Sequence, residues 1–280
     1  IDDALYTRNK KEALTYFKKA AKTGRVESMY NQALLMLEFH EDEKEAARLL
    51  ELCCQKNHPY SFYHYSCLLE EGRGVDKNLP LAQEYLQKAA DLGVPEAQYK
   101  LAKLLLSQGK TSEALPYLRN AANADIVPAM YDLAQVLKKE DPVAYENEIQ
   151  EWLEKAALQG HVDAAVEAAN YLLAKGEKAK AFNFYKIGAL GNNPEAMFHY
   201  AKLLEEGDKN VTIQDLPQAF TYYKKSAEME YVPSMYELGR CYANGIGTDK
   251  DPQLAMESYE NSANHGDPNG MVGIGHIYNE

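Results

Sequence analysis

One column of residues along this 280-residue chain could bind a partner through aromatic rings. Its members recur about once every 35 residues, and six of the eight are aromatic. Such rings give a large contact area at a small cost in side-chain entropy, which favours binding of a peptide or helix. The alternative is that the rings pack between adjacent helices of the fold. The column comprises Tyr30, Tyr63, Tyr99, Tyr131, Val166, Phe198, Tyr236 and Val272.

A second column follows four residues later and includes three cations. It consists of Leu34, Cys67, Lys103, Gln135, Asn170, Lys202, Arg240 and His276. Cations on one face of a chain with net charge −12 favour an acidic or extended peptide, although they could also pair with nearby glutamates. The predicted partner-binding set is Tyr30, Tyr63, Tyr99, Lys103, Tyr131, Gln135, Asn170, Phe198, Lys202, Tyr236, Arg240 and His276.

Residues that could carry out catalysis are not grouped in the sequence. The seven histidines are scattered, and there is no HExxH, GxSxG or CxxC pattern. We therefore predict no enzyme activity, no metal and no cofactor. Two glycine pairs, Gly72 with Gly74 and Gly245 with Gly247, follow helix ends and lack the third glycine of a dinucleotide site. We interpret them as helix caps and turns.

Composition excludes several classes of partner. The chain has 42 acids against 30 Lys and Arg, so an extended phosphate-binding surface for nucleic acid is not expected. No apolar run approaches the roughly 18 residues of a membrane span, so direct membrane insertion is not expected either.

The four cysteines indicate reduced thiols rather than a disulfide framework. Cys53 and Cys54 stand where other repeats have small residues and are expected to be buried, whereas Cys67 is the better candidate for a modifiable thiol. Few cysteines favour the cytoplasm, with the endoplasmic-reticulum lumen, the bacterial periplasm and secretion left open.

An internal repeat sets the positions of these columns. A block with an apolar or aromatic pair and then a small pair recurs, and its first small residue is Ala20, Cys53, Ala89, Ala121, Ala156, Gly188, Ser226 or Ser262. Spacings of three, four and seven residues within the block place these positions on one face of a helix. A second amphipathic helix follows each block, and six of these begin at Pro59, Pro95, Pro128, Pro194, Pro233 and Pro268. The pattern predicts an all-α array of helix pairs.

The sequence resembles the Sel-1-like repeat (SLR) family, which is related to the tetratricopeptide repeats. Close matches to the family pattern are Ala97–Ala102, Ala82–Gly93 and Tyr236–Gly247. The resemblance implies a right-handed α-solenoid, or superhelix, of antiparallel helix pairs. We expect one such domain over residues 1–280, with a leading second helix, seven complete pairs and a trailing first helix, as a fragment of a longer chain.

The resemblance also implies a function. Proteins of this family act mainly as adaptors and scaffolds, which predicts a non-enzymatic array that holds a protein or peptide on its concave face. Two alternatives are open: the segment regulates an enzyme within a larger polypeptide, or it is a hydrolase that acts on β-lactams. The second is less favoured, because the relatives proposed to have that activity carry two cysteines per repeat.

Overall fold

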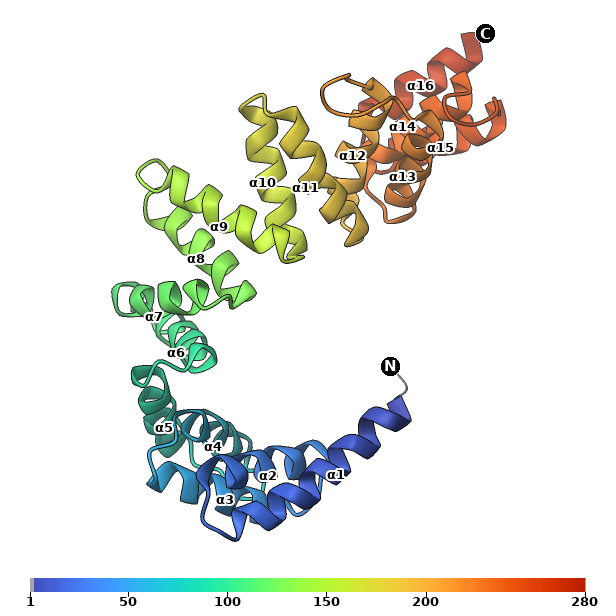
Figure 1. Ribbon diagram of the computed structural model, residues 1–280. Helices are drawn as coiled ribbons and strands as arrows, with labels where there is room; N and C mark the ends of the chain where they lie inside the picture. The colour runs from blue at the N-terminus through green and yellow to red at the C-terminus, as the bar shows by residue number, and fades with distance from the viewer. Residues whose placement is uncertain (1–2, 280) are drawn as a thin grey trace. The chain divides into compact units, whose positions relative to one another are not determined.

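The computed structural model describes residues 3–279, which fold into sixteen α-helices without a β-strand (Figure 1). The first eight are α1 (Asp3–Ala21), α2 (Val26–Glu38), α3 (Glu43–Gln55), α4 (Pro59–Glu71), α5 (Leu79–Asp91), α6 (Pro95–Ser107), α7 (Thr111–Asn123) and α8 (Val127–Glu140). The others are α9 (Glu146–Leu158), α10 (Val162–Ala174), α11 (Lys178–Leu190), α12 (Pro194–Glu206), α13 (Leu216–Glu228), α14 (Val232–Asn244), α15 (Pro252–Asn264) and α16 (Pro268–Asn279). The predicted all-α repeat architecture is confirmed.

The helices form two compact units, residues 1–129 and 130–280, and α8 begins in the first and ends in the second. Within each unit a helix packs mainly on the helices before and after it in the chain. Because the connecting turns are short, successive helices run antiparallel, as in other helical repeats. A single solenoid domain over residues 1–280 remains a prediction.

Two kinds of helix alternate, and small side chains let them pack closely. We call the even-numbered helices A helices, which carry the aromatic column, and the odd-numbered helices B helices. The alanines of one repeat position in the B helices are almost completely buried: Ala46, Ala82, Ala114, Ala181, Ala219 and Ala255. Small residues at these positions allow larger neighbours to interdigitate, so the repeat pattern is a packing pattern.

The turn from each B helix to the next A helix requires a left-handed residue. Positive φ angles occur at all eight of these turns: Gly24, Asn57, Gly93, Asp125, Gly160, Asn192, Glu230 and Gly266. Glycine adopts this conformation freely and asparagine tolerates it, whereas a longer side chain such as Glu230 is strained there. Glutamate does not favour this conformation, so the backbone at Glu230, with φ of 61°, is strained.

We expect Glu230→Gly to stabilise the chain. The substitution relieves left-handed strain of about 1–2 kcal/mol, and the greater freedom of glycine in the unfolded chain offsets part of it, leaving a gain of roughly 0.5–1 kcal/mol. Urea unfolding followed by circular dichroism measures the change. Glu230→Ala is the matched control, because it removes the same charge but keeps the strain. Equal stabilisation by both variants would mean that charge, not backbone strain, is responsible.

The two glycine pairs cap A helices, as the sequence predicts. Gly72 and Gly245 end α4 and α14 in the left-handed conformation. A Cβ atom on Gly74 would lie 2.0 Å from the backbone oxygen of Glu43, and one on Gly247 would lie 2.1 Å from that of Leu216. Each loop therefore lies directly on the first turn of the preceding B helix, which requires the second glycine of each pair.

Candidate functional surface

The aromatic column lies on the A helices with its rings partly buried. All six rings are intermediate in exposure, whereas Val166 is buried and Val272 is exposed. Each of these side chains is thus partly packed and partly in contact with solvent. Both interpretations of the column therefore remain physically possible, since a packed ring can still offer its free edge to a partner.

The packed edges contact the residue that precedes the next A helix. In the first unit the Tyr30 ring lies 4.6 Å from the ring of His58, which precedes α4. In the second unit Tyr131 stacks on His161 at 4.3 Å, and Phe198 lies 5.6 Å from Tyr231. These rings therefore join successive repeats, as the packing alternative expects. Binding by their free edges stays a prediction.

The hydroxyl groups of these tyrosines are shielded to different degrees. Burial, reinforced by electrostatic interaction with Tyr60 and Glu96, raises the pKa of Tyr30 to about 12. Burial also raises the pKa of Tyr63 and of Tyr131, where the hydrogen bond to Glu167 acts in the same direction. At neutral pH these hydroxyls remain protonated and serve as hydrogen-bond donors.

Glu167 of α10 accepts hydrogen bonds from three side chains of α8. Its Oε1 atom accepts hydrogen bonds from Tyr131 and Gln135, both at 2.9 Å, and its Oε2 atom accepts one from Lys138 at 3.2 Å. Burial alone would raise the pKa of Glu167, but these hydrogen bonds lower it overall. The carboxylate is charged and fixed in place, and it joins two predicted site residues, Tyr131 and Gln135.

Arg240 is the best-paired of the three predicted cations. Its guanidinium donates to both oxygens of Glu205, at 2.6 and 2.5 Å, and to Glu237 at 2.5 Å. Burial opposes its charge, but the two carboxylates raise the pKa of Arg240 overall. This arginine therefore holds α12 and α14 together.

The other two predicted cations are exposed to solvent. Lys103 lies on α6 and Lys202 on α12. The ammonium group of Lys103 lies 5.5 Å from the centre of the Tyr99 ring, within cation–π range. Lys202 has no ion-pair partner among the residues that the structure describes. Both side chains are therefore accessible to solvent.

The remaining predicted residues are spread over the same helices. Asn170 donates to Glu195 at 2.9 Å and accepts from the hydroxyl of Tyr185 at 2.6 Å. His276 is exposed on α16, and the Tyr236 ring lies 5.6 Å from that of Tyr259. The predicted set is therefore a row along each unit rather than one cluster.

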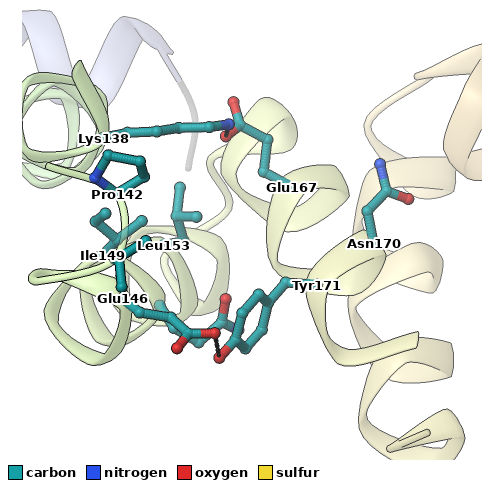
Figure 2. Close-up of a pocket in the computed structure, with 10 residues that line it drawn as sticks. Lys138, Pro142, Glu146, Ile149, Leu153, Glu167, Asn170 and Tyr171 are labelled. Carbon is teal, nitrogen blue, oxygen red and sulfur yellow. Dashed lines mark hydrogen bonds and ion pairs between the residues drawn. The ribbon is translucent and has the colours of Figure 1, made fainter. Parts of the chain in front are cut away.

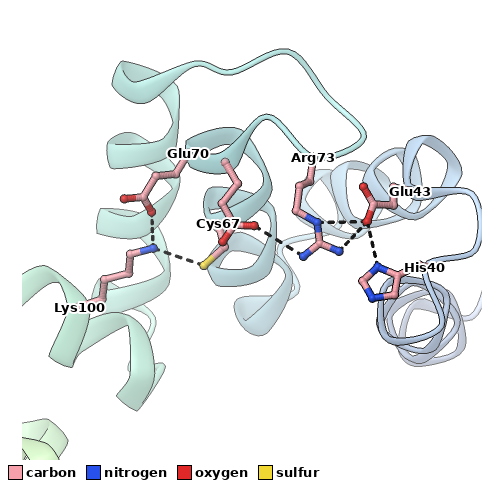
Figure 3. Close-up of polar contacts among 7 residues, drawn as sticks. His40, Glu43, Cys67, Glu70, Arg73 and Lys100 are labelled. Carbon is pink, nitrogen blue, oxygen red and sulfur yellow. Dashed lines mark hydrogen bonds and ion pairs between the residues drawn. The ribbon is translucent and has the colours of Figure 1, made fainter.

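Sequence analysis did not find the ion pairs that join successive A helices. In the first unit Lys100 of α6 binds Glu70 of α4 and donates to the sulfur of Cys67 at 3.5 Å, as Figure 3 shows. In the same figure Arg73 binds Glu43 at 2.6 Å, which fixes the loop after α4 on α3. A signal was present, since opposite charges recur about one repeat apart, but Lys and Glu are too common for it to be specific.

The four cysteines are all free thiols, in agreement with the sequence. Cys53, Cys54 and Cys241 are buried, and burial raises the pKa of the Cys54 and Cys241 thiols to about 12. Cys67 is partly exposed. The disulfide-stapled repeats that the β-lactam alternative requires are therefore missing from the chain.

We expect only one fast-reacting thiol in the native protein. A thiol reagent attacks the thiolate, and burial suppresses both ionisation and access at the other three cysteines. Titration with a chromogenic disulfide reagent at pH 8 should label Cys67 first and the rest only after unfolding. The Cys67→Ser variant should lose the fast phase. A fast phase that persists in this variant would contradict the burial of the remaining thiols.

A pocket of about 480 Å³ opens between α8, α9 and α10 (Figure 2). Pro142, Ile149 and Leu153 form its apolar side. At one end Lys138 reaches Glu167, and at the other the hydroxyl of Tyr171 donates to Glu146 at 2.9 Å. We call this pocket the α8–α10 notch.

Within the described part of the chain no group of three or more His, Cys, Asp or Glu side chains is placed to hold a metal ion. Nor does any helix in that part combine the length and apolar character needed to span a bilayer.

Stacked pairs of short antiparallel helices define a helical repeat protein of the tetratricopeptide type. The Sel1 repeat family model matches residues 4–24, 59–94, 150–161, 194–231 and 232–267, and a tetratricopeptide repeat model matches residues 96–124. The Sel1 matches cover half of the chain, so the chain belongs to the Sel1 repeat family. The resemblance noted in the sequence is thereby confirmed.

Two curated relatives are fungal. The chain is 25% identical over 273 residues to chitin synthase regulator SKT5 of Saccharomyces cerevisiae, covering 92% of this chain and 35% of that protein. It is 27% identical over 273 residues to chitin synthase regulatory factor 2 of Schizosaccharomyces pombe, covering 89% of this chain and 47% of that protein. The chain therefore spans less than half the length of these relatives.

Solved structures share the fold. A protective antigen of uropathogenic Escherichia coli strains with an SLR fold has a TM-score of 0.65 at 21% identity, covering 95% of this chain and 59% of that one. A Sel1 repeat protein of Oxalobacter formigenes has a TM-score of 0.56 at 23% identity, covering 97% and 81%. At this level of identity the likeness supports the fold alone.

Proposed function

We propose that this chain is a non-enzymatic adaptor that binds a protein or peptide on the surface formed by its A helices, the expected concave face. The observation that carries the proposal is the repeated surface itself. Successive A helices carry partly exposed aromatic rings, and Lys103 and Lys202 are exposed cations without a carboxylate partner among the residues that the structure describes. A surface of this kind gives affinity through a few ring anchors and orientation through charge.

The names of the curated relatives support a regulatory role. Two are named as a regulator and a regulatory factor of chitin synthase, and this chain matches less than half of each. The role we propose is therefore control of another protein by contact, with the regulated enzyme on a separate chain. An enzyme elsewhere in the same polypeptide remains the alternative, and the same surface would then act within one molecule.

The charge of the partner follows from the two exposed lysines. An ammonium group near an aromatic edge favours a carboxylate beside an apolar or aromatic group. We therefore propose an extended, acidic segment as the ligand of the A-helix surface of each unit, around Lys103 in the first unit and around Lys202 in the second.

Charge reversal tests the proposal. We expect Lys103→Glu combined with Lys202→Glu to weaken partner capture at least tenfold, because each new carboxylate replaces an attraction by a repulsion. Binding is measured by affinity capture and then by titration of the partner identified. Both lysines are exposed, so circular dichroism and the melting temperature should not change.

The matched control reverses two exposed lysines of B helices, Lys186 on α11 and Lys224 on α13. This variant carries the same total charge and should bind the partner within twofold of the unchanged chain. If the control loses as much affinity as the test variant, net charge decides binding. The A-helix surface would then have no special role.

A further inference from the structure

The α8–α10 notch occupies a position that recurs in the repeat. Its counterpart between α4, α5 and α6 has a volume of about 300 Å³, and the counterpart between α10, α11 and α12 about 170 Å³. In sequence register, Ile149, Leu153 and Asn170 of the first pocket correspond to Ala82, Leu86 and Lys103 of the second. The second column of the sequence thus lines a series of equivalent notches.

The α8–α10 notch differs from its counterparts in its apolar wall. The chain between α8 and α9 adds Pro142 and Val143 to the lining. Val143 is 83% exposed, whereas Ile149 and Leu153 of the same lining are buried. An apolar side chain that enters here would cover Val143 and gain the free energy of leaving water. The notch volume lies within the range of about 300–1,000 Å³ found for ligand pockets.

Two fixed carboxylates flank that wall. Glu167 is held by its three donors, and the Oε1 atom of Glu146 accepts a hydrogen bond from Tyr171 at 2.9 Å and forms an ion pair with Lys175 at 2.9 Å. The other oxygen of Glu146, Oε2, makes no hydrogen bond to any residue that the structure describes. This oxygen can accept a hydrogen bond from a cation outside.

The segment between Lys139 and Lys155 is acidic. Residues 140–154 contain no Lys, Arg or His and six acids, namely Glu140, Asp141, Glu146, Glu148, Glu151 and Glu154. A cationic side chain next to a bound apolar one is therefore attracted, whereas an acidic one is repelled. The apolar wall therefore binds the apolar side chain, and the acidic segment favours basic residues next to it in the partner.

We propose that the α8–α10 notch binds one large apolar side chain, such as leucine, from a partner segment in which the adjacent residues are Lys or Arg. This proposal rests on the proposed function, because it names one anchor of the same partner surface. The next notch limits how far the basic stretch extends, since it is lined by Lys178 and Lys202. The basic residues therefore lie on the α9 side, and the acidic part of the partner lies toward α12.

Three labelled peptides of equal length test the notch. Their central sequences are Lys-Lys-Leu-Lys-Lys, Lys-Lys-Ser-Lys-Lys and Glu-Glu-Leu-Glu-Glu, and each is titrated into the full chain by fluorescence anisotropy at 0.15 M salt. The basic leucine peptide should bind, and each of the other two should bind at least tenfold more weakly, since one lacks the anchor and the other the charge. Equal binding of the serine peptide would overturn the anchor, and equal binding of the acidic peptide would overturn the charge preference.

A pair of variants locates the binding. Val143→Arg should lower the affinity for the basic leucine peptide at least tenfold, whereas Ile213→Arg should change that affinity by less than twofold. Ile213 is the matched control, because it is also an exposed apolar residue, 88% exposed in the loop before α13, but does not line the notch. Equal losses in the two variants, or no saturation up to 1 mM peptide, would overturn the notch as a binding site.

The peptides, together with the charge-reversal variant at Lys103 and Lys202, separate this proposal from the adaptor role. If the chain captures a partner in a manner sensitive to Lys103 and Lys202 but ignores the peptides, the notch proposal fails and the adaptor role stands. If charge reversal at those lysines leaves capture unchanged, the proposed A-helix surface fails whatever the peptides do.

Discussion

Replacing Tyr223 with Ala should lower the free energy of unfolding by about 3–5 kcal/mol. This α13 side chain is 1% exposed, and its hydroxyl donates to Glu205 at 3.0 Å. Alanine would leave a cavity among the packed helices of the second unit and remove a donor from a partly buried carboxylate. Urea unfolding followed by circular dichroism measures the loss.

Tyr223→Phe separates the two contributions. It keeps the ring and removes only the hydroxyl, so the expected loss is about 1 kcal/mol. The remaining loss in Tyr223→Ala then belongs to packing. Two variants of equal stability would show that the ring contributes little, and that the second unit is less tightly packed at α13 than the structure indicates.

Replacing Arg240 with Ala should lower the free energy of unfolding by about 2–3 kcal/mol. Breaking a fully buried ion pair costs about 3–5 kcal/mol and an exposed pair at most about 1 kcal/mol, and this arginine lies between the two limits. The reason is that Glu205 and Glu237 would remain close together without a cation. Thermal and urea unfolding measure the effect.

Arg240→Lys is the control for charge, because it keeps a cation but loses the two-pronged geometry. Its expected stability lies between those of the unchanged chain and Arg240→Ala. Because Tyr223 and Arg240 share Glu205, the Tyr223→Phe and Arg240→Ala changes should not be additive. Strict additivity would contradict a shared network.

The fold could be predicted from the sequence because it depends on a period. Buried alanines such as Ala46 and Ala181, and the prolines that open A helices such as Pro59, recur about once per repeat and need no knowledge of distant contacts. The left-handed turns also recur once per repeat, and glycine or asparagine marks most of them in the sequence, whereas Glu230 does not. Because the same pattern recurs in every repeat, the assignment of each helix supported the assignment of the others.

The candidate surface was harder to predict, since spacing does not reveal which partner a charged side chain meets. Lys103, Lys202 and Arg240 share one column, yet Arg240 is bound to two glutamates while the lysines are exposed. The difference comes from Glu205, which lies 35 residues before Arg240 in the chain. The α8–α10 notch depends on the chain between α8 and α9, which supplies Pro142 and Val143 and lies outside the helical pattern of the repeat.

Hydrogen–deuterium exchange of the full chain, alone and with its captured partner, tests the central claim most directly. The claim is that the A helices form the binding surface. It predicts slower exchange in the partner complex within A helices such as α6 and α12, and little change in B helices such as α7 and α13. Protection confined to the B helices would contradict it.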